Sequence, residues 1–97
     1  MKKIDGLDAL LKPLTKRDLK AELVPTLRDI IVESVGRRKP DNFKQGNGFY
    51  KLADKLIAAK DSIELEDIEY ETVQDSVKDN PTGYFPYYLG QVMEILK

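Results

Sequence analysis

Apolar residues recur along this 97-residue chain at intervals of three and four positions, the spacing that places side chains on one face of a helix. The pattern predicts helices over five stretches of the chain: residues 4–14, 26–36, 48–60, 66–79 and 86–96. Residues 16–23 fit either a short helix or a short strand, because their apolar residues also alternate. The sequence therefore predicts an all-α fold, a small bundle of about five short helices that forms one domain over residues 1–97.

Residues at the ends of these stretches are typical of helix termini. Thr26 stands three positions before Asp29, which is the spacing of a capping box, and Gly36 is a candidate for the end of that helix. Asn47 is a candidate cap for the third predicted helix, and Pro86 suits the first turn of the last one.

The helical spacing also predicts which side chains pack inside. The predicted core consists of Ile4, Leu7, Leu10, Leu11, Leu14, Leu27, Ile30, Ile31, Val35, Phe49, Leu52, Ala53, Leu56, Ile57, Leu65, Ile68, Val73, Val77, Leu89, Val92, Met93 and Leu96. In the aromatic cluster over residues 84–88, we expect Phe85 and Tyr88 to join this core. Tyr84 and Tyr87 are candidate contact residues, because tyrosine is enriched where proteins meet.

Charge is sorted along the chain. Residues 61–79 hold eight acidic residues and one lysine, a net charge of −7, whereas residues 1–60 hold 14 basic and eight acidic residues, a net charge of +6. The formal total of −1 therefore conceals a protein with two charged regions. Such asymmetry bears on the choice of partner and on encounter rates.

The acidic residues of the fourth predicted helix form a row. Asp67, Glu71, Asp75 and Asp79 follow one another at intervals of four, so they share one ridge of a helix with a rise of about 6 Å between neighbours. Glu64 joins the ridge if the helix begins early. The full candidate surface for partner binding consists of Glu64, Glu66, Asp67, Glu69, Glu71, Asp75, Asp79, Tyr84 and Tyr87. A solvated helix face that keeps the protein soluble is the simpler explanation of the same charges.

The composition gives little support to catalysis or to metal binding. The chain has neither histidine nor cysteine, which removes the usual general base at neutral pH, the thiolate nucleophile and the commonest metal ligands. The spacing of an EF-hand calcium loop is also absent. We therefore expect no enzyme activity, no cofactor and no metal. No apolar run approaches the roughly 20 residues that span a bilayer, and the first residues do not form a signal sequence, so we expect a cytoplasmic protein.

Three segments together resemble a set of small phage and prophage proteins. They are residues 26–31 (TLRDII), 49–56 (FYKLADKL) and 89–96 (LGQVMEIL), in the order and rough spacing seen in that set, and residues 63–67 (IELED) match a further element in part. The similarity extends over about residues 26–97. Leu56 stands where the set usually has isoleucine.

Small size, this phage-like pattern and the acidic helix also resemble anti-CRISPR proteins, which phages use to inhibit bacterial CRISPR complexes. Some anti-CRISPR proteins are acidic mimics of DNA that occupy the basic path of the target DNA. The resemblance implies a host protein or ribonucleoprotein with a basic DNA-binding groove as the partner, in the bacterial cytoplasm. Such mimics tend to be strongly acidic throughout, and this chain is nearly neutral, so mimicry here would come from one face.

The leading hypothesis is therefore a phage-derived inhibitor that binds a DNA-targeting complex through its acidic helix and blocks the binding of target DNA. The first alternative is a phage morphogenesis or tail-assembly accessory protein that uses its aromatic C-terminal region. The second is a small DNA-binding regulator that uses the basic loop over residues 37–39. The leading hypothesis predicts no direct binding of nucleic acid and leaves the oligomeric state open.

Overall fold

The computed structural model describes residues 1–15, 24–79, 81 and 83–97, and within them the protein is mostly helical. Four helices are present in this part of the chain: α1 (Leu27–Gly36), α2 (Phe43–Ala58), α3 (Asp67–Asp79) and α4 (Pro86–Ile95). Two short strands, β1 (Lys2–Ile4) and β2 (Ile63–Leu65), form an antiparallel pair with Lys2 opposite Leu65 and Ile4 opposite Ile63. The helical character of the prediction is confirmed, but the fold is not purely α. The choice between helix and strand for residues 16–23 lies outside the described residues.

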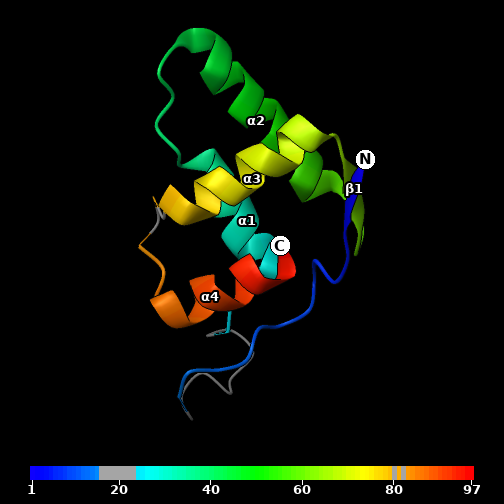
Figure 1. Ribbon diagram of the computed structural model, residues 1–97, viewed down its shortest axis with the longest axis vertical. Helices are drawn as coiled ribbons and strands as arrows, with labels where there is room; N and C mark the ends of the chain where they lie inside the picture. Colours follow the sequence, from blue (N-terminus) through cyan, green and yellow to red (C-terminus); the bar gives the residue numbers. More distant parts are fainter. Residues whose placement is uncertain (16–23, 80, 82) are drawn as a thin grey trace.

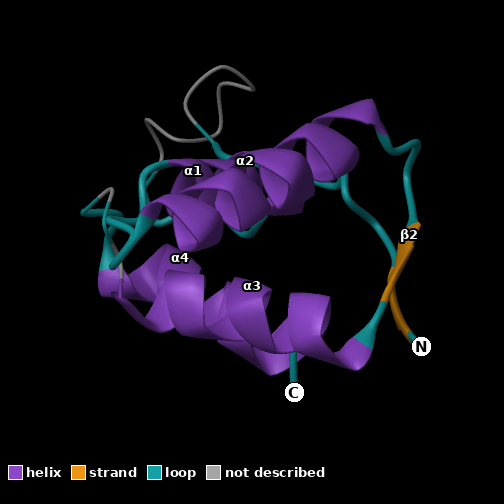
Figure 2. Cartoon of the chain, turned by 90° about the horizontal axis from the view of Figure 1, so that it is seen from above, coloured by secondary structure: helices purple, strands orange, loops and turns teal. Residues whose placement is uncertain are grey.

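Helix α1 lies at the centre of the arrangement. Helices α2 and α3 both pack against it, and α4 packs on α3 and on α1 (Figure 1). Seen from above, α1 and α2 form one layer and α3 and α4 form a second, with the strand pair at one end (Figure 2). The core fills the space between the layers. Its most deeply buried side chains are Leu7, Leu27, Ile30, Ile31, Val35, Leu56, Leu65, Val73, Val77, Val92 and Leu96.

The start of α1 follows the sequence prediction. The Thr26 hydroxyl accepts a hydrogen bond of 3.0 Å from the backbone N–H of Asp29, and the Asp29 carboxylate accepts one of 3.0 Å from the N–H of Thr26. This capping box satisfies two backbone donors that a helix terminus leaves without partners. Gly36 is still helical, and Arg37 is the capping residue at the C-terminal end.

The predicted helix over residues 4–14 is wrong. The segment begins with the last residue of strand β1 and continues as irregular chain with a turn over residues 7–8, before which Gly6 has a φ of +71° that few other residues adopt. Its backbone bonds with distant residues: the N–H of Leu7 donates to the carbonyl of Asp61 at 2.8 Å, and the carbonyl of Leu7 accepts from the N–H of Arg28 at 2.8 Å. Ile4, Leu7 and Leu11 are buried as predicted, but Leu10 and Leu14 are exposed.

Helix α2 begins earlier than predicted. The side chain of Asn42, and not that of Asn47, caps it by accepting a hydrogen bond of 2.8 Å from the N–H of Gln45. Gly46 lies within the helix. A Cβ atom at Gly46 would stand 3.3 Å from Cγ of Pro40, so glycine lets the preceding loop pack closely on the helix.

The guanidinium group of Arg28 joins three segments of the fold. It donates hydrogen bonds to backbone carbonyls at the end of α2 and just beyond it, at 2.8 Å to Leu56 and 2.6 Å to Ala59. It also forms an ion pair of 3.0 Å with Asp8, and its side chain is only 17% exposed. The last carbonyls of a helix have no partner within the helix and favour a nearby cation. Arg28 supplies both the donors and the charge.

Replacing Arg28 by methionine is therefore expected to lower the free energy of unfolding by about 2–3 kcal/mol, because several carbonyls, two of them partly buried, lose a charged donor and the exposed Asp8 loses its ion pair. Arg28→Lys should recover only part of this loss, since an ammonium group cannot reproduce the planar fork of donors. Urea denaturation of both variants measures the effect. Arg37→Met, at an exposed position, is the control and should change stability by less than about 0.5 kcal/mol. Equal stability of the Arg28 and Arg37 variants would contradict the assignment.

Candidate functional site

The predicted acidic row lies on the solvent-facing side of α3. Asp67, Glu71, Asp75 and Asp79 are all exposed, while Tyr70, Val73, Ser76 and Val77 occupy the buried side of the same helix. At 1.5 Å per residue, the row extends over about 18 Å and crosses the exposed face at a slant, as residues spaced by four do on any α-helix.

Glu64 and Glu66 do not continue this row. Glu64 belongs to strand β2, where it is exposed between the buried Ile63 and Leu65 and stands opposite Lys3. Glu66 precedes the first turn of α3, and its backbone N–H donates to the Glu69 carboxylate at 3.0 Å. The strand pair therefore excludes the early helix start that would have placed Glu64 on the ridge.

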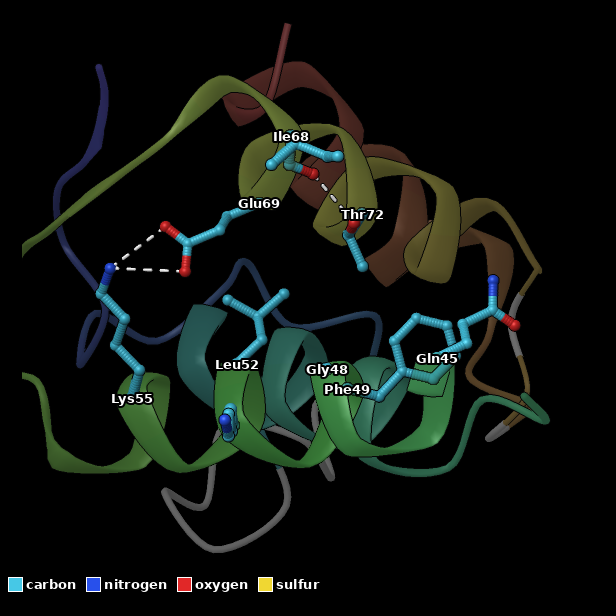
Figure 3. A pocket seen from close by; sticks show the side chains of 9 residues that line it. Gln45, Gly48, Phe49, Leu52, Lys55, Ile68, Glu69 and Thr72 are labelled. Carbon is cyan, nitrogen blue, oxygen red and sulfur yellow. Dashed lines mark hydrogen bonds and ion pairs between the residues drawn. The ribbon is translucent and has the colours of Figure 1, made fainter. Parts of the chain in front are cut away.

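Two of the predicted acidic residues are engaged within the fold. The carboxylate of Glu69 accepts from the ammonium group of Lys55 at 3.1 Å (Figure 3). Asp79 pairs with Arg38 at 3.5 Å. Of the acidic residues predicted for the surface, those that form no ion pair with any described residue are Glu64, Glu66, Asp67, Glu71 and Asp75. We call Asp67, Glu71 and Asp75 the acidic face of α3.

Ile68 lies beside this acidic face and is 70% exposed. The prediction that it packs inside is wrong; Tyr70 takes the buried place, with Lys2 above its ring at 5.7 Å. A residue two positions from Tyr70 lies about 200° away around a helix, so both cannot face the same core. An exposed isoleucine among carboxylates gives the acidic face an apolar contact point.

A cleft of about 540 Å³ separates this part of α3 from α2. Figure 3 shows the pair of Lys55 and Glu69 at one end of the cleft and Gln45 towards the other. Leu52 forms part of the α2 wall, and Ile68 lies on the α3 side. The cleft thus has an apolar middle with polar ends, and it adjoins the acidic face.

The buried and exposed members of the aromatic cluster over residues 84–88 differ in part from the prediction. Tyr88 is buried as expected, but Phe85, which was expected in the core, is 61% exposed because it caps the start of α4 outside the helix. Tyr87 is 42% exposed and meets Tyr88 edge to face at 5.6 Å. Tyr84 is half-buried, and its hydroxyl donates a hydrogen bond of 2.7 Å to Glu33 on α1. Tyr84 therefore links α1 to the segment before α4, and Tyr87 is the more accessible of the two candidate contact residues.

The basic loop is partly used by the fold. Arg38 packs its guanidinium over the ring of Phe49 at 5.2 Å and donates to the hydroxyl of Ser76 at 3.3 Å, in addition to its pair with Asp79. Arg37 and Lys39 remain exposed. One of the three cations in the loop is thus held in place by contacts with α2 and α3.

A second exposed apolar surface was not predicted. Phe43, Tyr50 and Ile57 on α2 are exposed, although Ile57 was expected inside. Their spacing of seven residues is visible in the sequence and is the signal that could have identified them as one helical stripe.

Comparison of the chain with protein-family models, curated proteins and solved structures gives no match. The resemblance to phage and anti-CRISPR proteins therefore stays a prediction. Within the described ranges, no helix has the length and apolar character needed to cross a membrane, and no three acidic side chains gather as a metal-binding set. What the geometry defines is a small, mostly helical protein with an acidic helix face and an apolar helix face.

The environment of Tyr84 predicts a pH dependence of stability. Burial raises the pKa of its hydroxyl well above the ordinary 10.0, and the hydrogen bond to Glu33 together with the negative charges of Glu33 and Asp29 raises it further. Because the folded-state pKa is the higher one, the stabilisation is complete below about pH 10 and is lost as the pH rises further. Denaturant unfolding between about pH 8 and pH 11 should show a steeper loss of stability in the wild type than in Tyr84→Phe. The control Tyr87→Phe should follow the wild type, and identical profiles for all three proteins would contradict the prediction.

Proposed function

We propose that this protein is a stoichiometric inhibitor of the anti-CRISPR type, of phage origin, that acts by binding and not by chemistry. The acidic face of α3 would occupy a groove of Lys and Arg residues in a host DNA-targeting complex and exclude the target DNA. The observation that carries the proposal is the row formed by Asp67, Glu71 and Asp75, all exposed and without an ion pair to any described residue.

The energetics of α3 support a partner of opposite charge. Like charges spaced by four residues cost a helix about 0.2–0.5 kcal/mol per pair, so the row destabilises an isolated α3. The buried side of the helix offsets this cost through Tyr70, Val73 and Val77, which pack against the core. A basic partner would remove the repulsion and add charge-assisted hydrogen bonds.

The row resembles one strand of DNA because it carries negative charges that follow one another along a line. Each strand of B-DNA carries a phosphate for about 3.4 Å of rise, whereas the carboxylates follow at about 6 Å. A groove with flexible Lys and Arg side chains can adapt to this difference. Ile68 adds a contact that phosphates cannot provide, so the proposed partner surface has an apolar position next to its cations.

The alternative of a phage morphogenesis protein draws on a different observation. Phe85 and Tyr87 at the start of α4 are exposed and follow the anchored Tyr84 within three positions, as expected of a hydrophobic contact site. The alternative of a DNA-binding regulator has less support, because Arg38 is held within the fold and the acidic face repels phosphate.

Reversing the charges of the acidic face tests the proposal. The triple variant Asp67→Lys, Glu71→Lys and Asp75→Lys should lose binding to a CRISPR complex in a pull-down from CRISPR-bearing bacteria, and wild-type binding should weaken with added salt. The control reverses the exposed Asp5, Asp41 and Glu94, which adds the same charge elsewhere. Circular dichroism checks folding, since a lysine in the first turn of α3 costs about 0.3–1 kcal/mol. Retained binding by the folded triple variant, or equal loss in the control, would refute the proposal.

Truncation of Ile68 distinguishes a binding face from a face that is merely solvated. Ile68→Ala should weaken binding of the partner by about tenfold, because the side chain is buried only in the complex, and should change the stability of the free protein by less than about 0.5 kcal/mol. Titration of the partner identified in the pull-down, together with urea denaturation, measures both effects. Binding as tight as that of the wild type would remove Ile68 from the interface.

A further inference from the structure

Helix α2 carries apolar side chains on two separate sides, about 125° apart around the helix axis. Phe49, Leu52 and Leu56 face the core, and each is less than 9% exposed. On the outer side, Phe43 is 92% exposed, Tyr50 is 68% exposed and Ile57 is 59% exposed. A helix of a monomeric protein needs only the first of these sides to be apolar.

The outer residues lie in one row along the helix. Phe43, Tyr50 and Ile57 are spaced by seven, which brings each to nearly the same side of the helix, over a length of about 21 Å. We call these three residues the α2 stripe. Spacing by seven is the pattern with which helices pair along a common seam.

A hollow of about 510 Å³ lies at the N-terminal end of the α2 stripe. Its walls come from the loop before α2 and from the first two turns of the helix. The residues that line it are Pro40, Asn42, Phe43, Gly46, Asn47 and Tyr50. Gly46, with Pro40 packed against it, forms the wall of the hollow between Phe43 and Tyr50. Figure 1 places this end of α2 at one end of the long axis, far from α4.

We propose that the α2 stripe binds the α2 stripe of a second copy of this chain, with the two helices antiparallel and related by a two-fold axis through Tyr50. Phe43 and Ile57 lie seven residues to either side of Tyr50, so this axis sets Phe43 of one copy against Ile57 of the other, twice. Ile57 of the second copy then faces the hollow beside Phe43. A knob on each helix thus meets a hole on its partner.

The charges beside the stripe match in this antiparallel arrangement. Lys44 lies six residues before Tyr50 and Asp54 lies four residues after it, both on the same flank of the stripe. The two-fold axis therefore brings Asp54 of one copy within about 3 Å, measured along the helix, of Lys44 of the other. Asn47 of the other copy lies close to the same carboxylate. Neither Lys44 nor Asp54 has an ion pair among residues 1–15, 24–79, 81 and 83–97.

A parallel pair of α2 helices lacks this complementarity, because its two-fold axis runs along the helices and turns the flank of Lys44 and Asp54 in one copy away from the same flank of the other. The contact of one helix pair falls near or below the roughly 1,200 Å² at which stable protein interfaces begin. We therefore expect a reversible dimer that dissociates on dilution.

The interface uses no residue of the acidic face of α3, so it is independent of the proposed function.

Sedimentation velocity over a range from low to high micromolar concentration tests the dimer. The wild type should pass from monomer to dimer as the concentration rises. Tyr50→Asp should stay monomeric, because it places two carboxylates at the two-fold axis. Tyr87→Asp, which changes an exposed tyrosine of α4 in the same way, should dimerise like the wild type.

A charge exchange gives the sharper result and does not depend on the tolerance of Tyr50 to substitution. Lys44→Glu and Asp54→Lys should each weaken the dimer by about tenfold, since each change acts twice across the two-fold axis. The double variant should recover most of the wild-type affinity, because the ion pairs re-form with exchanged signs. A wild type that is monomeric throughout, a dimer that survives Tyr50→Asp, or a double variant no better than the single ones would overturn the proposal.

Discussion

The contacts of Arg28 are the constraint on which the arrangement of the other elements depends. Its guanidinium group holds the carbonyls at the end of α2 and the carboxylate of Asp8 at once, so α1, α2 and the N-terminal segment are fixed relative to one another. The hydrogen bond from the N–H of Leu7 to the carbonyl of Asp61 ties the same segment to the chain just after α2. Strand β2 and then α3 follow within a few residues. The position of α3, and with it the acidic face, is therefore set by a charged group that is largely buried.

Features that depend on neighbouring residues were predicted from the sequence, and features that depend on distant ones were not. The capping box of Thr26 and Asp29 is a local pattern, and so is the proline that begins α4. The pairing of β1 with β2 joins residues about sixty positions apart, and no local sequence pattern predicts it. In residues 4–14 the burial of Ile4, Leu7 and Leu11 fits a helix, but the backbone bonds with other segments instead of with itself. Periodicity identified these buried residues without identifying the conformation that buries them.

The same limit applies to the candidate site. An apolar stripe wider than the contact with the core includes residues that remain outside, as Ile57 and Ile68 do, and the sequence does not say which members these are. Counting charges likewise overstated the acidic surface, because Glu69 and Asp79 are paired with Lys55 and Arg38. Such pairs depend on which helices face each other. The sign of the surface follows from composition, whereas the ion pairs from Lys55 on α2 and from Arg38 determine how much of that charge stays unpaired.

The two exposed faces share one scaffold. Both α2 and α3 pack against α1, and their outer sides carry different features: the apolar α2 stripe on one helix and the acidic face on the other. A face on a helix that is already packed loses little conformational freedom on binding, so a larger share of the interaction energy appears as affinity. Three exposed apolar residues on one helix favour a contact through burial, and three carboxylates on another favour a contact through charge. A chain of this size can thus present two surfaces of different chemistry, each on its own helix.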